Sequence, residues 1–345
     1  MNAKIAGRAR FAVKIAGMKR RNFLAMAAML PVLRAAAAAE PTIAELDGAE
    51  AFWERMRAHA FSPDELRELF SKIRVNERVI ALMDAPSDPS RKTYWREYRR
   101  RRLSPRHIAE GARFMRRHAA ILSRAEEKYG VPGEIITAIL GVETRYGKVL
   151  GGFGTARALA TLAFAYPRRA AEFQNELAEL LIYARRYGMN PLSLRGSFAG
   201  AFGMPQFLPG SARRFAVDFD EDGRADLFSV ADAAGSIGNF LVEHGWKRGG
   251  AISYPVAAIP DPTPLEEATR QNGYKPVFTR EILAAAGVEA GDIADELYLL
   301  VDLENRYDTE YRLGAQNFYA LTRYNKSFKY AAAVFDLSVA LRAGG

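Results

Sequence analysis

Apolar residues recur at three- and four-residue intervals from residue 40 to about residue 122, and glycine is rare in this stretch. Such spacing predicts amphipathic helices. Ser104 followed by Pro105 is typical of a helix start, with serine as the N-cap and proline in the first turn. Another helix is predicted from Pro132 to about Thr144.

The pattern of residue types changes twice after these helices. Glycine-rich segments at 147–154 and 196–210 each lead into further helix, and the region after Gly249-Gly250 favours short strands instead. The predicted strands are 252–257, 297–303 and 310–313, with proline-rich turns around 260–264. We therefore expect a mainly α (α+β) protein. Its predicted parts are a helical region at 40–249, a small β-containing insert at 250–313 and a helical return to the core at 314–345.

Residues 1–39 differ from the rest of the chain. A basic stretch at 19–21 precedes a short apolar run at 25–33 and an alanine run at 35–39. A basic start, an apolar segment too short to span a bilayer and small residues behind it predict an export signal. The paired arginines followed by Asn-Phe-Leu resemble the bacterial twin-arginine signal, and Met18 is an alternative start. The other interpretation is an amphipathic helix that stays on the mature protein.

The signal also explains most of the charge. The chain has a formal net charge of +9, of which residues 1–39 carry +8, so the main body carries only +1. A nearly neutral body gives little support to nucleic-acid binding. No cysteine follows the apolar run, so we expect no lipid anchor. The prediction is a protein that is soluble in the periplasm after the signal is removed.

Composition excludes several classes of protein and of chemistry. With 49% hydrophobic and 26% charged residues, the 345-residue chain is typical of a globular protein, not of a disordered, collagenous or multi-span membrane protein. The absence of cysteine excludes disulfides, thiolate nucleophiles and cysteine-based metal sites. The four histidines are scattered, and the sequence has no HExxH, Walker A or G-x-S-x-G motif. We expect no cofactor for catalysis.

The segment IITAILGVETRYG places one acid on an apolar helix face. Ile136, Ile139, Leu140 and Glu143 share that face by their three- and four-residue spacing. Burial favours the protonated carboxyl and raises its pKa, which suits a general acid that protonates a glycosidic oxygen. A glutamate in the last helical turn that pairs with Arg145 fits the spacing equally. The pattern alone leaves both interpretations open.

Several longer motifs resemble the lytic murein transglycosylase B family. They are GVETRYG, ATLAFAYPRRAAEF, GSFAGAFGMPQFLPGS, an Asp-rich loop, HGW and LTRYNKS, in that order over roughly residues 50–340. The resemblance implies a lysozyme-like helical catalytic core with an EF-hand-like loop and a small β region. It implies that Glu143 is the single catalytic acid/base. It further implies cleavage between N-acetylmuramic acid and N-acetylglucosamine in peptidoglycan, leaving a 1,6-anhydro end.

A missing carboxylate agrees with this implied reaction. Hydrolases of the usual type need a second acid to activate water or attack the sugar, and GSFAGAFGMPQFLPG contains none. In a transglycosylase the sugar's own 6-hydroxyl attacks instead. A goose-type muramidase, which uses Glu143 and an activated water, remains an alternative. So does a catalytically silent scaffold that binds peptidoglycan, although an intact GVETRYG motif disfavours it.

Further residues are candidates for binding the glycan. Ser197 and Gln206 can hydrogen-bond to sugar hydroxyl and amide groups, and the resemblance implies that both line the cleft. Aromatic residues can stack on sugars or shape the groove, although such side chains are more often core. Arginines can bind carboxylates of the peptide stems. The aromatic, asparagine and arginine candidates are Tyr98, Tyr146, Phe207, Tyr324, Asn325, Arg168 and Arg169.

The Asp-rich loop predicts a calcium site. Asp218, Asp220 and Asp222 occupy positions one, three and five of an EF-hand-like loop, and the Arg224 backbone carbonyl occupies position seven. Position twelve is Ser229 in place of the usual glutamate, so the standard pattern fails there. The resembled family has a longer loop, whose closing carboxylate matches Asp232. We expect a structural Ca²⁺, the alternative being an empty, hydrogen-bonded acidic turn.

The expected partners follow from the implied function. They are peptidoglycan glycan strands and, as candidates, cell-wall synthases or amidases. No nucleic acid and no stable membrane anchor are expected. The mode of action along the strand, the stem preference and the oligomeric state do not follow from the sequence.

Overall fold

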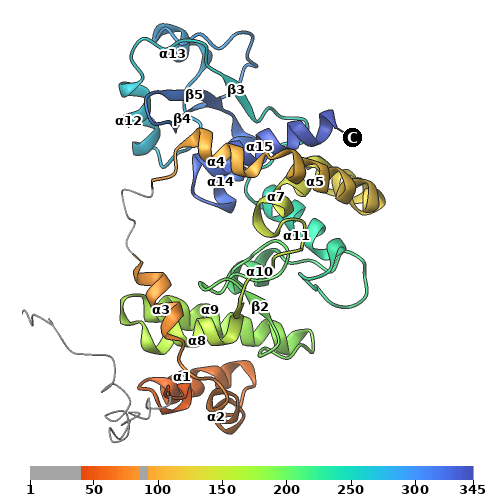
Figure 1. Ribbon diagram of the computed structural model, residues 1–345, viewed down its shortest axis with the longest axis vertical. Coiled ribbons are helices and arrows are strands. Elements are labelled where there is room, and N and C mark those ends of the chain that lie inside the picture. Colours follow the sequence, from red (N-terminus) through yellow and green to blue (C-terminus); the bar gives the residue numbers. More distant parts are fainter. Residues whose placement is uncertain (1–39, 86–91, 345) are drawn as a thin grey trace, which may run out of the picture. The chain divides into compact units, whose positions relative to one another are not determined.

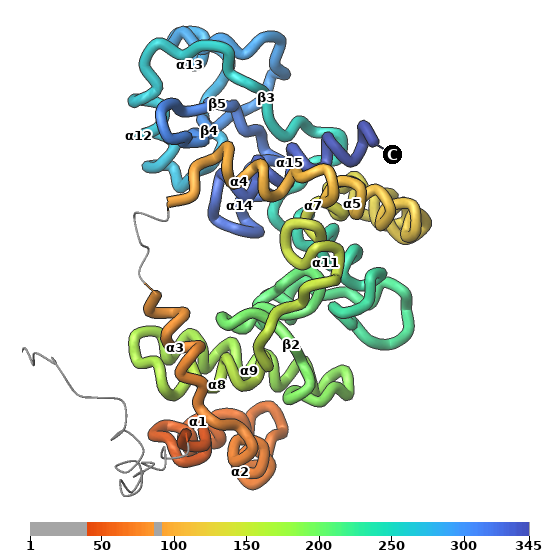
Figure 2. Tube along the Cα trace, in the orientation of Figure 1, coloured from red at the N-terminus to blue at the C-terminus, as the bar shows by residue number. Residues whose placement is uncertain are grey.

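The computed structural model describes residues 40–85 and 92–344. The predicted export signal at 1–39 lies outside the described residues. Figure 1 and Figure 2 show that helices dominate the described chain. Helices of its first half are α1 (Ala49–Met56), α2 (Pro63–Ser71), α3 (Glu77–Asp84), α4 (Trp95–Arg102), α5 (Pro105–Arg117), α6 (Ala119–Tyr129), α7 (Gly133–Thr144) and α8 (Thr155–Ala165). Later helices are α9 (Ala170–Arg186), α10 (Pro209–Phe215), α11 (Val230–Glu243), α12 (Thr263–Gln271), α13 (Arg280–Ala285), α14 (Gln316–Tyr324) and α15 (Phe328–Ala343).

Short elements complete the fold. The 3-10 helices within residues 40–85 and 92–344 are η1 (Ile43–Glu45), η2 (Arg57–His59) and η4 (Pro167–Arg169). A two-stranded antiparallel pair joins β1 (Phe153–Gly154) to β2 (Arg195–Gly196). A three-stranded antiparallel sheet has the order β3-β5-β4, formed by β3 (Ser253–Pro255), β4 (Leu299–Glu304) and β5 (Thr309–Gly314). All three strands of this sheet begin and end within two residues of the positions expected from the sequence.

The predicted helix starts are present and have the expected chemistry. Ser104 is the N-cap of α5, and its Oγ accepts a hydrogen bond from the backbone N–H of His107 at 3.3 Å. Pro132 precedes the first residue of α7. Nearly every residue of α7 is buried because the helix packs against α5, α6, α11 and α15. An apolar helix surrounded on all sides is the central element of the core.

The sheet is buried on both of its faces. Successive side chains of β4 point to opposite faces, so Leu299, Val301 and Leu303 join the main core while Leu300 joins a second, smaller cluster. That smaller cluster is covered by α12 and α13, two helices which the sequence did not predict between 260 and 297. Figure 1 shows α12 and α13 on the side of the sheet away from α14 and α15. The insert therefore has its own small core and also contributes to the main one.

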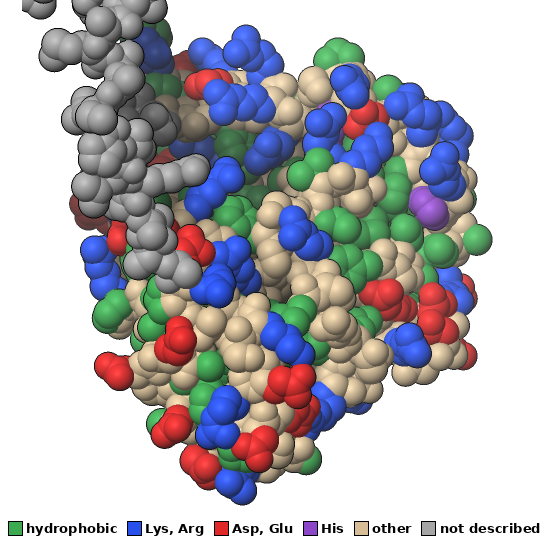
Figure 3. Space-filling view, turned by 60° about the horizontal axis from the view of Figure 1, so that its bottom comes forward, with side chains coloured by type: hydrophobic (Ala, Val, Ile, Leu, Met, Phe, Trp, Pro, Cys, Tyr) green, Lys and Arg blue, Asp and Glu red, His purple; other side chains and the backbone are tan. Residues whose placement is uncertain are grey.

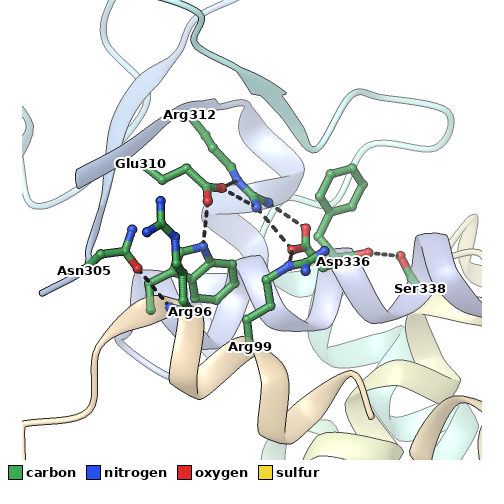
Figure 4. A network of polar contacts seen from close by, with 9 residues as sticks. Arg96, Arg99, Asn305, Glu310, Arg312, Asp336 and Ser338 are labelled. Atoms are coloured by element: carbon green, nitrogen blue, oxygen red, sulfur yellow. Dashed lines mark hydrogen bonds and ion pairs between the residues drawn. The ribbon is translucent and has the colours of Figure 1, made fainter. Parts of the chain in front are cut away.

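A polar network joins the insert to α4 and α15 (Figure 4). Arg312 on β5 donates two hydrogen bonds to Asp336 on α15, at 2.6 and 3.1 Å, and Arg99 on α4 donates to the same carboxylate. The other Arg312 partner, Glu310, also accepts from the Trp95 indole at 3.0 Å. Side chains of Arg312 and Asp336 are only 12% and 9% exposed. We call these five residues the Arg312 network.

The surface has mixed charge. On the face shown in Figure 3, Lys and Arg side chains gather in the upper half, whereas Asp and Glu are more frequent lower down and at the right. This distribution agrees with the small net charge of the chain beyond residue 39. Among the helices that the structure describes, none has the length and apolar character needed to cross a bilayer.

Candidate active site

The site is built around the last turn of α7, where Glu143 lies. The helix ends at Thr144 because the next two residues leave the right-handed region, with φ of 50° at Arg145 and 62° at Tyr146. The Tyr146 N–H donates to the Leu140 carbonyl and the Arg145 N–H donates to the Gly141 carbonyl, both at 3.0 Å, so these two carbonyls of the last turn have partners. Left-handed backbone at two consecutive non-glycine residues is unfavourable and must be held by surrounding contacts.

Tyr146 supplies those contacts. Its hydroxyl donates to the His107 carbonyl at 2.9 Å, and its ring stacks on the His107 imidazole with centroids 4.9 Å apart. Gly111 on α5 and Gly141 on α7 make room for the ring, since a Cβ at either position would lie within 3 Å of it. The tyrosine thus fixes the turn directly after the candidate acid.

Glu143 itself is half-buried. Burial raises the pKa of its carboxyl to about 7, against the opposing effects of the Tyr330 hydroxyl and of the positive charge of Arg102. The Tyr330 hydroxyl lowers the pKa of Glu143, although no hydrogen bond of ordinary geometry joins the two groups. Among the described residues, the Tyr330 oxygen has no other hydrogen-bond partner. A carboxyl with this pKa is present in both protonation states near neutral pH, as an acid/base catalyst requires.

The structure separates the two interpretations of Glu143 that the sequence left open. Arg145 lies 3.5 Å from Glu110, a carboxylate on α5 that also lies 3.4 Å from Lys148 and accepts from Arg106 at 3.1 Å. Glu143 has no ion-pair partner among the described residues. The paired-glutamate alternative is therefore wrong, and the carboxyl is free for chemistry.

The glycine-rich loop at 196–208 is tied to this helix end. The Thr144 hydroxyl donates to the Met204 carbonyl at 3.0 Å, and the Tyr324 hydroxyl donates to the Pro205 carbonyl at 2.6 Å. A Cβ on Gly196 would lie 2.1 Å from the Ala201 carbonyl oxygen, so the tight return of the loop requires glycine there. The loop is held beside α7 and α14 by these bonds.

Ser197 and Gln206 both lie in this loop. The Ser197 Oγ accepts from the Ala201 N–H at 3.1 Å, which leaves its own hydroxyl proton available to a ligand. The Gln206 amide nitrogen donates to the carbonyls of Leu150 and Gly203, at 3.1 and 2.8 Å. These bonds fix the amide with its oxygen left as a hydrogen-bond acceptor. Their roles toward glycan remain predictions.

The aromatic candidates divide into two groups. Tyr98 and Tyr324 are partly exposed, and Tyr324 stacks on Tyr330 with an interplanar angle of 11°. Phe207 and Tyr146 are 3% and 6% exposed. The aromatic residues were expected either to stack on sugars or to shape the groove. Phe207 and Tyr146 can only shape the site, because neither buried ring presents a free face to a sugar.

The remaining glycan candidates lie apart from these contacts. Asn325 is exposed at the end of α14, next to Tyr324. Arg168 pairs with Asp84 at 3.2 Å and Arg169 pairs with Glu172, so both guanidinium groups already have acidic partners. Nothing in these contacts connects either arginine to Glu143.

The sequence analysis did not single out Tyr330 or Arg102. Tyr330 lies on the first turn of α15, and burial together with the Glu143 charge raises its pKa, so its phenol stays protonated. Arg102 lies 5.1 Å over the Tyr98 ring at the end of α4, and its buried Nε has no hydrogen-bond partner among the described residues. The available sequence signal for Tyr330 was its position six residues after Tyr324. Arg102 is one of four consecutive arginines, so nothing in the sequence distinguished it from its neighbours.

The Asp-rich loop forms a separate feature between α10 and α11. Carboxylate oxygens of Asp218, Asp220 and Asp222 lie within 4.8 Å of one another. The predicted fourth carboxylate, Asp232, is not grouped with them. Its two oxygens accept backbone N–H bonds from Phe219 and Asp226, each at 2.7 Å. Three acids and the nearby Arg224 carbonyl suit a hard cation such as Ca²⁺, whereas Asp232 organises the loop through its backbone.

The arrangement around Glu143 supports acid/base chemistry on an uncharged substrate. One carboxyl with a pKa near neutrality interacts with Tyr324, Tyr330 and Arg102, and the neighbouring loop carries the Ser197 hydroxyl and the Gln206 amide oxygen. Among the described residues, no second carboxylate affects the pKa of Glu143. The site therefore has one proton donor and acceptor, with polar and aromatic surroundings.

Comparisons with known proteins agree with this description. The family described as "Transglycosylase SLT domain" matches residues 45–339. The chain is 38% identical over 307 residues to membrane-bound lytic murein transglycosylase B of Escherichia coli, covering 85% of this chain and 82% of that protein.

Solved structures of the same kind also match. The soluble lytic transglycosylase SltB1 of Pseudomonas aeruginosa has a TM-score of 0.79 at 38% identity, covering 86% of this chain and 98% of that one. The Escherichia coli transglycosylase Slt35 in complex with calcium has a TM-score of 0.78 at 34% identity, covering 92% and 99%. These matches confirm the predicted mainly helical, lysozyme-like fold. The chain therefore belongs to the transglycosylase SLT domain family and is an enzyme of the lytic murein transglycosylase class.

Proposed function

We propose that Glu143 alone performs both proton transfers in a non-hydrolytic cleavage of peptidoglycan between N-acetylmuramic acid and N-acetylglucosamine. The observation that carries the proposal is the single half-buried carboxyl at the end of α7, with a pKa raised to about 7 and no partner acid among the described residues. A hydrolase of the two-carboxylate type would need a second acid at the site.

The proposed reaction has two proton transfers. Protonated Glu143 gives its proton to the glycosidic oxygen as the bond from that oxygen to the anomeric carbon of muramic acid breaks. The 6-hydroxyl of the same sugar then bonds to the anomeric carbon and returns its proton to the carboxylate. The product carries a 1,6-anhydro ring and no water is consumed. Glu143 ends in its starting protonation state, so one residue suffices for a full cycle.

The surrounding residues have supporting roles in the proposal. The partly exposed rings of Tyr98 and Tyr324 offer faces to the sugars, and Ser197 and Gln206 offer a hydroxyl and an amide oxygen. The buried Tyr146 and Phe207 hold the turn after Glu143 and the floor beneath Tyr324. Location in the periplasm is part of the same proposal, since the substrate is the cell wall.

Mass spectrometry of the products tests this reaction. Purified protein would digest isolated sacculi, and the soluble fragments would be analysed before and after borohydride reduction. We expect fragments one water lighter than hydrolysis products and resistant to reduction. Reducible ends would contradict the proposal and favour a muramidase that recruits a water.

The contact with Tyr330 predicts a shift in the pH profile. Because the Tyr330 hydroxyl lowers the Glu143 pKa, Tyr330→Phe should raise that pKa above about 7. Glu143 then stays protonated to higher pH, so the alkaline limb of the kcat profile should move to higher pH. The maximal kcat should fall several-fold. The measurement is the pH profile on purified glycan strands. An alkaline limb that stays in place or moves to lower pH would show that the hydroxyl does not act on Glu143.

We further propose that Asp218, Asp220 and Asp222, with the Arg224 carbonyl, bind a structural Ca²⁺. Support comes from the clustering of the three carboxylates, and a relative, Slt35, has been solved with calcium. The ion would crosslink the loop and take no part in bond cleavage. Asp232 would contribute by holding the loop backbone.

Removal of calcium tests this site. At calcium about 100-fold above its Kd, the thermal midpoint should exceed that in EGTA by about 4 °C. Asp220→Asn should abolish the difference, whereas Arg224→Ala should keep it because only the backbone carbonyl of Arg224 binds the ion. Equal midpoints with and without calcium in the unaltered protein would contradict the proposal.

A further inference from the structure

A pocket lies between the β-containing insert and the segment that joins α14 to α15. It has a volume of about 480 Å³. One wall comes from the end of α12 and from β4, and the other comes from residues 322–329. A pocket of this size accommodates a small ligand or a few residues of a peptide.

The pocket is strongly basic. Its lining includes Arg270, Arg323, Lys326 and Lys329 against one acid, Asp302. Arg323 and Lys326 have no acidic partner among the described residues, Lys329 donates to the Thr93 carbonyl, and Arg270 lies 3.6 Å from Glu266. Two cations are therefore available to an anionic ligand, and two more contribute positive potential.

One acid adds a second kind of recognition. Asp302 projects from β4 into the same lining and has no side-chain hydrogen bond among the described residues. Its carboxyl is partly buried, and this burial raises its pKa. A ligand that carries carboxylates together with an amino group would match both the cations and this acid.

An aromatic pair closes one end of the pocket. Tyr274 is 46% exposed and adopts φ of 64°, a conformation that is unfavourable for a large side chain. Its ring meets Phe328 edge to face, with centroids 5.4 Å apart. The contact joins the insert to the first residue of α15.

The pocket is connected to the active site through the chain itself. Tyr324 and Tyr330, which both interact electrostatically with Glu143, flank the segment 325–329, which supplies Lys326, Phe328 and Lys329 to the pocket. A ligand in the pocket would thus bind the short segment whose flanking residues, Tyr324 and Tyr330, interact with Glu143. The glycan itself is largely uncharged, so a basic pocket here calls for a different part of the substrate.

We propose that this pocket binds the peptide stem of peptidoglycan through its carboxylate groups, a proposal that rests on the proposed function. Arg323 and Lys326 would hold carboxylates, and Asp302 would accept from a free amino group of the stem. The stem candidates named from the sequence, Arg168 and Arg169, pair with Asp84 and Glu172 on the surface and stay a separate prediction. The pocket would select strands that carry intact stems.

Binding without turnover tests the proposal directly. The Glu143→Gln protein would be titrated by calorimetry with a purified disaccharide-tetrapeptide, and with the same disaccharide after an amidase has removed its peptide. Arg323→Ala/Lys326→Ala should weaken binding of the first probe about tenfold, as the loss of charge-assisted hydrogen bonds predicts. The matched control is Arg116→Ala/Arg186→Ala, which removes two exposed positive charges elsewhere.

Kinetics give a second measurement on otherwise unaltered enzyme. We expect the ratio of KM for stem-bearing strands to KM for stem-free strands to rise about tenfold in the pocket variant and to stay constant in the control. A constant ratio, or an equal loss of affinity for both probes, would overturn the stem proposal. Reducible products would overturn the transglycosylase reaction instead, and the calorimetric comparison would still report on the pocket.

Discussion

Glu143→Gln should reduce cleavage of sacculi by about 10³-fold or more, because the amide cannot transfer a proton and no other carboxylate replaces it at the end of α7. Glutamine keeps the size and the hydrogen-bonding capacity of the side chain, so glycan binding should persist. The measurement is the release of soluble fragments together with binding to sacculi. Glu127→Gln, an exposed change on α6, is the control.

The same substitution has an expected effect on stability that distinguishes a buried acid from an exposed one. The folded-state pKa of Glu143 is raised, so its contribution to stability is fully present below about pH 4.5 and is lost as the pH rises through about 7. Glutamine removes this loss. The free energy of unfolding of the variant should therefore exceed that of the unaltered protein at pH 8 and approach it at pH 5. Retained turnover, or equal pH dependence of stability, would show that Glu143 is not the buried catalytic acid.

Asp336→Ala should produce the largest loss of stability in the described chain outside the apolar core. The substitution leaves the Arg312 guanidinium, only 12% exposed, without its two hydrogen bonds to Asp336, and also removes the partner of Arg99. Breaking a buried ion pair from one side costs about 3 kcal/mol, since the remaining charge stays desolvated. Chemical denaturation would measure the free energy of unfolding.

A surface pair provides the control for this prediction. Asp308 pairs with Arg96 at 2.7 Å, but the two side chains are 50% and 71% exposed. Asp308→Ala should therefore cost less than about 1 kcal/mol. The double variant Arg312→Met/Asp336→Leu should recover much of the lost stability by replacing the pair with apolar contacts. If Asp336→Ala is no more harmful than Asp308→Ala, the Arg312 network does not stabilise the fold.

Local patterns predicted the helices and strands because their signals are local. Ser104 and Pro105 mark a helix start by capping and by backbone geometry, and the nearly continuous apolar run in β4 is typical of a strand with two covered faces. The helices α12 and α13 were missed because they are short and carry their apolar residues toward a small core that exists only when the sheet is formed. Tertiary context decides such elements.

The candidate site was predictable only as far as single motifs reach. GVETRYG identified Glu143, but neither periodicity nor spacing showed that Arg145 turns away to Glu110, since that depends on a left-handed backbone and on a carboxylate from α5. The same applies to Tyr330, which comes to Glu143 from another helix. The acidic partners of Arg168 and Arg169 likewise become visible only after folding, and the role of both arginines toward the peptide stem stays a prediction.

The position of α15 in the chain has a consequence for when the enzyme becomes active. Glu143 is made early, but Tyr324 and Tyr330 lie close to the end of the sequence, after the entire β-containing insert. A polypeptide that ends before α15 would contain the acid and most of the core but lack the helix that carries Tyr330. We therefore expect such a fragment of this wall-cutting enzyme to keep Glu143 without forming the complete active site.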